Sequence, residues 1–106
     1  IADREPEFYI ERYSYQQNPT LVLELWELAE SLNLKTFKKQ ANSTIFDDHV
    51  PLYQMAGIPA IDIIDFDFPN EKTNYHHTHQ DIVQNCSPKG LDEVGTLMLN
   101  HIYNIK

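Results

Sequence analysis

Apolar residues recur at helical spacing in two stretches of this chain. The first follows Asn18-Pro19, where Asn18 can cap a helix and Pro19 suits the first helical position, and it ends at Asn33. The apolar face of this first helix is formed by Leu21, Val22, Leu25, Leu28, Ala29 and Leu32. The second helix opens at Ser87-Pro88. Its apolar face is formed by Leu91, Val94, Leu97, Met98 and Ile102. Both patterns predict helices that pack one face on a sheet, and we expect Trp26 to be a packing anchor.

A short apolar run over residues 59–64 differs from these two stretches. It is too short and too apolar for a surface helix, so it predicts a central parallel strand. A short helix is expected before it, with Asp48 as its cap, Pro51 in its first turn and Gly57 as its end. Residues 36–39 predict a further short strand.

The remaining segments are expected to be irregular. Residues 1–17 mix polar and aromatic side chains without a clear period, and residues 14–17 are typical of a loop. Residues 65–76 are expected to form another loop, with a turn at Pro69-Asn70. The order helix, strand, short helix, strand and helix predicts an α/β fold, in which ligands gather beyond the carboxyl ends of the strands.

Composition narrows the function classes. With 106 residues, the protein is one domain or a part of one. The net charge of −8 disfavours nucleic acid and anionic membranes as partners. No apolar run approaches the length of about 20 residues that a membrane span needs. The single cysteine, Cys86, excludes an internal disulfide.

Two polar clusters carry the candidate chemistry. Three of the five histidines lie within residues 76–79, after the predicted strand, and Asp81 follows them. The second cluster is Asp47-Asp48-His49. Imidazole and carboxylate are common zinc ligands, and loops at one sheet edge would bring the clusters together. The alternatives are exposed loop histidines, a helix-capping Asp48 and a packed structural His49.

Several motifs in register resemble a zinc exopeptidase family that includes the di-zinc aminopeptidases and the glutaminyl cyclases. The resemblance covers residues 45–103 well and residues 1–34 more loosely. The segments that carry it are Asp47 to Leu52, Ala56 to Ala60, His77-Thr78 with Asp81, and Ser87 to Gly95. The Asp-Asp-His sequence looks more like the cyclase branch. The resemblance implies that residues 1–106 are the C-terminal part of a single catalytic domain, a three-layer α/β/α sandwich with a mixed, mostly parallel sheet.

The resemblance also implies roles for particular residues. His77 matches the last zinc-binding histidine, and Asp47 matches an active-site carboxylate in a series of hydrogen bonds near the substrate. The positions that match the lining of the cyclases' small apolar pocket are Ile45, Ile64 and Phe68. His76 stands where cyclases usually place tryptophan, so it is assigned to substrate binding. The other zinc ligands and a catalytic glutamate of the family lie upstream of the matched region.

The expected function is that of a zinc-dependent glutaminyl cyclase-like enzyme, which converts an N-terminal glutamine into pyroglutamate. The alternatives are a di-zinc aminopeptidase of the same family and a non-catalytic assembly module. The expected partners are a peptide N-terminus as substrate and either the remainder of the parent domain or an oligomer partner. The full-length protein is expected in the periplasm or outside the cell, and residues 1–106 alone are expected to be inactive.

Overall fold

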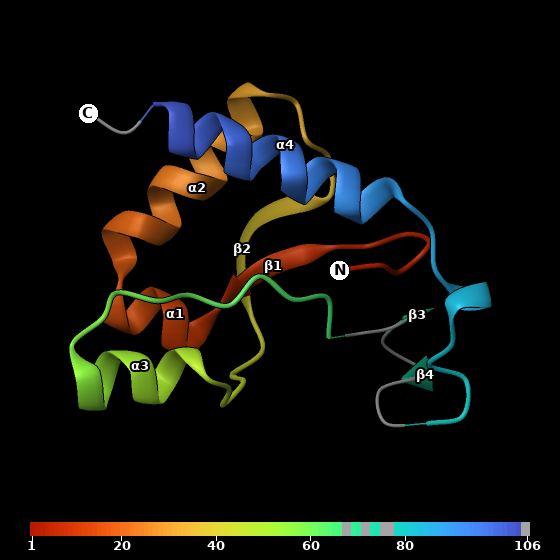
Figure 1. Cartoon of the computed structure of the whole chain (residues 1–106), viewed down its shortest axis with the longest axis horizontal. Helices are drawn as coiled ribbons and strands as arrows, with labels where there is room; N and C mark the ends of the chain where they lie inside the picture. Colours follow the sequence, from red (N-terminus) through yellow and green to blue (C-terminus); the bar gives the residue numbers. More distant parts are fainter. Residues whose placement is uncertain (67–68, 71–72, 75–77, 105–106) are drawn as a thin grey trace.

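A parallel pair of strands organises the structure. The computed structural model describes residues 1–66, 69–70, 73–74 and 78–104. Strand β1 (Phe8–Glu11) pairs with β2 (Phe37–Asn42) from Phe8 opposite Phe37 to Glu11 opposite Asn42, with an irregularity after Tyr9. The predicted strand at residues 36–39 is therefore confirmed and continues to Asn42. In Figure 1, α2 and α4 lie above this pair, and α1 and α3 lie below it.

The first 17 residues are more regular than their sequence predicts. Besides β1, they contain helix α1 (Arg12–Gln17), so the loop predicted at residues 14–17 is wrong. Phe8 and Ile10 are buried, which anchors the strand. The Glu11 side chain then accepts hydrogen bonds from the first backbone N–H groups of α1 and caps the helix.

Helix α2 (Pro19–Ser31) matches its prediction closely. Its buried residues are Val22, Leu25, Trp26 and Ala29. The Trp26 indole N–H donates to the Phe8 carbonyl at 3.1 Å, and its ring meets the Phe37 ring edge-on with centroids 5.4 Å apart. Trp26 is thus the expected packing anchor. Asn18 makes no side-chain cap on α2, and its amide nitrogen donates to the Ala60 carbonyl.

Helix α4 (Lys89–Tyr103) crosses α2 and completes the core. Leu97 is fully buried, and Val94 and Met98 pack against the core. Leu91 and Ile102 are 50% and 59% exposed, so the predicted apolar face is wrong at these two positions. The side chains of α4 that join the core are therefore Val94, Leu97 and Met98.

The ends of α4 and of the short helix α3 (His49–Ala56) also differ in part from their predictions. The Ser87 hydroxyl is bonded to backbone carbonyls of residues 3 and 4, so it does not cap α4. Asp48 precedes α3 in a helical conformation and makes no side-chain cap. Gly57 ends α3 as predicted, with a left-handed φ of 66° that glycine adopts without strain. None of the helices in the described ranges is both long and apolar enough to cross a membrane.

The strand predicted at residues 59–64 is not formed. Ile61 and Ile63 pack against the core as expected, but the segment joins no sheet in the described part of the molecule. Side chains take backbone groups that a ladder would need: the Ser14 hydroxyl accepts from the Asp62 N–H, and Asn18 binds the Ala60 carbonyl. Further on, β3 (Pro69–Asn70) pairs antiparallel with β4 (Thr73–Asn74), so the turn predicted at Pro69-Asn70 is wrong.

The packing of the two long helices gives a stability prediction. Leu25 and Leu97 are 3% and 0% exposed, so Leu25→Ala or Leu97→Ala should each lower the free energy of unfolding by about 2–5 kcal/mol. The matched control Ile102→Ala, at a 59% exposed position of α4, should change it by less than about 0.5 kcal/mol. Urea denaturation measures all three; a neutral Leu97→Ala would contradict the described packing of α4.

Candidate functional site

A buried carboxylate, Glu11, lies at the centre of the polar side of the fold. It is 2% exposed and accepts from the backbone N–H groups of Tyr13, Ser14 and Ile45 at 2.7–3.0 Å. The Ser14 hydroxyl donates to it at 2.9 Å, and His49 Nε2 lies 2.7 Å from its Oε1. Burial raises the pKa of Glu11, but the backbone and hydroxyl bonds outweigh burial and lower it below its ordinary value. The carboxylate is therefore ionised at neutral pH.

His49 lies between two carboxylates. It is 5% exposed, which confirms the interpretation of a packed structural histidine. Its Nδ1 lies 4.0 Å from Asp62 Oδ2, and neither atom has a hydrogen-bond partner among the described residues. Desolvation raises the pKa of Asp62, and the charges of Asp47, Glu11 and Asp48 act in the same direction against the lowering effect of His49.

The loop from Ile45 to His49 brings several predicted site residues to this centre. Asp47 is exposed, and its Oδ1 accepts the Asp48 N–H at 2.8 Å. Ile45 and Ile64, both predicted to line a pocket, line one small cavity of about 20 Å³ with Glu11. Asp47 is not among the residues that line this cavity, but it follows Ile45 by two positions in the same loop.

A second cavity of about 220 Å³ adjoins the first and contains a carboxyl pair that the sequence pattern does not reveal. Ile64, Asp65 and Phe66 line both cavities, and Asp3 lines the larger one. Asp3 is 5% exposed. Burial, followed by the hydrogen bond and negative charge of Asp3, raises the pKa of Asp65 to about 7. No local pattern could have indicated this pair, because its members are far apart in the sequence.

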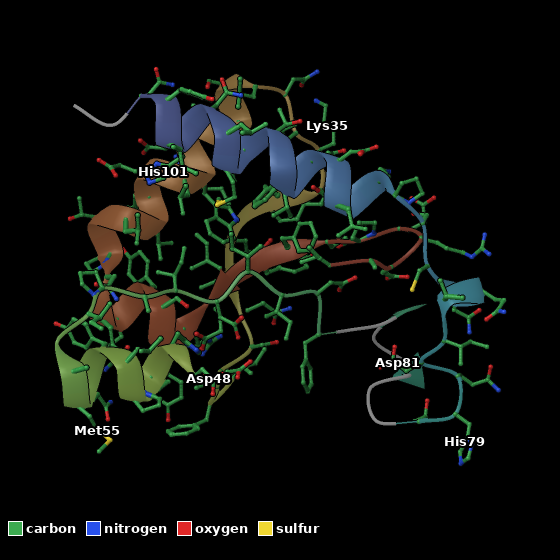
Figure 2. The ribbon with its side chains drawn as sticks, in the orientation of Figure 1. Lys35, Asp48, Met55, His79, Asp81 and His101 are labelled. Atoms are coloured by element: carbon green, nitrogen blue, oxygen red, sulfur yellow. The ribbon has the colours of Figure 1, made fainter. Side chains whose placement is uncertain are left out.

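The histidine cluster is described only in part. Phe68, His76 and His77 lie outside the described residues. His79 is exposed and points away from the body of the protein, far from Asp48 in Figure 2. Asp81 lines the larger cavity. Within the described ranges, no group of three or more histidine, cysteine or acidic side chains could hold a metal ion. The described residues therefore do not form a zinc site by themselves.

Comparison with known proteins identifies the family. The chain matches Peptidase family M28 over residues 1–102 and belongs to it. It is similar to Tannerella forsythia glutaminyl cyclase, at 33% identity and a TM-score of 0.90, covering 100% of this chain and 38% of that one. A Zn-dependent exopeptidase from Parabacteroides distasonis is 30% identical with a TM-score of 0.90, over 99% of this chain and 37% of that one.

A leucine aminopeptidase precursor from Bacteroides thetaiotaomicron is 31% identical with a TM-score of 0.91, covering 100% of this chain and 36% of that one. The protein described here thus spans less than two-fifths of each of these structures. A comparison of this sequence with curated proteins found no match. The expected family and the α/β class with a parallel strand pair are confirmed, and relatives in this family are enzymes.

The carboxyl pair gives a prediction for pH dependence. Folded Asp65 keeps its proton up to a pKa of about 7, whereas the unfolded protein loses it near 3.8, so stability should fall as pH rises between these values. The pKa of Asp62 is also raised, so this residue likewise lowers stability as pH rises. The pKa of Glu11 is lowered, so this residue lowers stability as pH falls, but only below its ordinary pKa of 4.5.

Asp65→Asn removes the titrating group and can donate an amide N–H to Asp3. The variant should therefore lose less stability than the native protein between about pH 5 and about pH 8. Urea midpoints across this range measure the effect, with Asp92→Asn, on the first turn of α4, as the control. Parallel pH curves for the native protein and Asp65→Asn would contradict the raised pKa.

Proposed function

We propose that residues 1–106 form the C-terminal part of a single zinc exopeptidase-like catalytic domain with glutaminyl cyclase activity. The observation that carries this proposal is the match of all 106 residues to a bacterial glutaminyl cyclase at a TM-score of 0.90 and 33% identity. In the proposed reaction the α-amine of an N-terminal glutamine attacks the carbonyl carbon of its own γ-amide. A new bond from the α-nitrogen to this carbon closes the pyroglutamate ring, the bond from the carbon to the amide nitrogen breaks, and ammonia leaves.

The geometry around Asp47 supports this proposal. Its carboxylate is exposed and can accept a proton or a hydrogen bond, and it lies in the same loop as Ile45. Ile45 and Ile64, which line one small cavity, are the proposed apolar lining for the substrate side chain. Phe68 and His76 are the further proposed substrate-binding residues. Zinc is the proposed cofactor and His77 one of its ligands, with the remaining ligands outside residues 1–106.

A second candidate is aminopeptidase activity, because the leucine aminopeptidase precursor is equally similar to this protein. Both candidates use a peptide N-terminus as substrate. A third candidate is a non-catalytic assembly module. Apolar side chains that would suit assembly are exposed on α3 and α4, such as Met55 at 86% and Tyr103 at 83% (Figure 2 shows Met55). The remainder of the parent domain, or an oligomer partner, is the proposed cover for these surfaces. We also propose that the full-length protein is located in the periplasm or outside the cell, which cell fractionation would test.

The zinc assignment predicts a contrast between two histidines. In the complete domain, His77→Ala should remove bound zinc and turnover, because a three- or four-ligand site does not tolerate loss of an imidazole. The matched control His79→Ala changes a side chain that is exposed and points outward, so it should leave both nearly intact. Zinc content by elemental analysis and turnover of an N-terminal-glutamine peptide measure the contrast. Equal zinc loss in the two variants would rule out His77 as the specific ligand.

The isolated 106-residue protein provides a second test. It supplies one proposed zinc ligand, so it should bind zinc weakly and turn over neither an N-terminal-glutamine peptide nor aminoacyl anilides. Isothermal titration with zinc and both assays on a verified monomer measure this, with the complete domain as the positive control. In the complete domain, turnover of the glutamine peptide supports the cyclase, turnover of anilides alone supports the aminopeptidase, and turnover of neither supports the module.

A further inference from the structure

One carboxylate holds both ends of the loop that carries Asp47. At the start of the loop, the Ile45 N–H donates to Glu11 Oε2 at 3.0 Å. At its end, His49 Nε2 lies 2.7 Å from Glu11 Oε1. Asp47 lies between these two points, so the position of its backbone depends on the two contacts that Glu11 makes.

The carboxylate is itself fixed. Glu11 is the last residue of β1, and its side chain also caps α1 through Tyr13 and Ser14. It is 2% exposed, so the charged group has no alternative partner in bulk water. Charged hydrogen bonds of this kind are short and strong when they are buried. The loop is therefore attached to a carboxylate that is buried and that several hydrogen bonds hold in place.

A second carboxylate restricts the imidazole from its other side. Asp62 Oδ2 lies 4.0 Å from His49 Nδ1. The Ser14 hydroxyl joins the two carboxylate-bearing segments, because it donates to Glu11 Oε1 and accepts from the Asp62 N–H. The ring of His49 is thus confined between two acidic side chains while the first turn of α3 starts from it.

We propose that Glu11 and His49 are positioning residues that hold the loop from Ile45 to His49, and through it Asp47, in one conformation. The effect on catalysis rests on the proposed function, whereas the effect on the loop does not. Neither residue touches a substrate in this proposal. Each acts through the backbone of the loop.

Amide hydrogen exchange tests the effect on the loop in the complete domain. Glu11→Gln and His49→Ala should each raise exchange at the Ile45 amide, which donates to Glu11, by about tenfold or more, since each loses a hydrogen bond to a buried charge. His49→Gln keeps a side-chain N–H donor and should restore protection. The matched control Ser14→Ala removes one donor from the same carboxylate but neither loop contact, so it should leave the Ile45 amide protected. If Glu11→Gln does not fold, His49→Ala with its glutamine rescue decides.

A double-mutant cycle tests the effect on catalysis. Glu11→Gln should lower kcat by about tenfold or more with KM nearly unchanged, and by less than about twofold when Asp47→Asn is already present. Equal losses in both backgrounds, or unchanged exchange at the Ile45 amide, would overturn the proposal. If the native domain turns over neither peptide substrate, the proposed function fails, and the exchange result alone decides whether Glu11 and His49 hold the loop.

Discussion

The ionised carboxylate of Glu11 is the constraint on which the polar side of this structure depends. A buried charge is strongly unfavourable unless hydrogen bonds replace its lost hydration, and here donors come from three places in the sequence. The end of β1, the start of α1 and the loop before α3 must therefore meet at this one point. Separating any of them from the others would leave a buried charge short of a partner.

The apolar side is joined by different means. Trp26 packs its ring against Phe37 and gives its N–H to the backbone of Phe8, so α2 is fastened to both strands by one side chain. Leu97 adds α4 to the same core, and the bond from Thr36 to Glu93 links the start of β2 to that helix. This half therefore depends mainly on apolar packing, with two side-chain hydrogen bonds that fix α2 and α4 to the strands.

The sequence predicts α2 and α4 well, because long stretches with a helical period are determined mainly by local apolar spacing. It misses β1 because this strand forms by pairing with β2, which lies far along the sequence. It misses α1 because the cap of this helix is Glu11, and glutamate is not among the residues usually preferred at a cap. It predicts a strand at residues 59–64 from their apolar run, but no strand pairs with this segment among the described residues, and the side chains of Asn18 and Ser14 bind two of its backbone groups. For the site, Asp47, Ile45 and Ile64 came from a family resemblance, and no periodicity would have selected them. The pair of Asp3 and Asp65 depends on a tertiary contact alone.

The order of these contacts in the sequence has a consequence for how the protein forms. Phe8, Trp26 and Phe37 belong to β1, α2 and β2, so the aromatic centre can assemble from one continuous stretch of polypeptide. During synthesis from the amino terminus, this stretch leaves the ribosome before Ile45 and His49 do. Glu11 then keeps its water until those two donors arrive. Docking of the loop before α3 is thus the step that completes the hydrogen bonding of this single carboxylate.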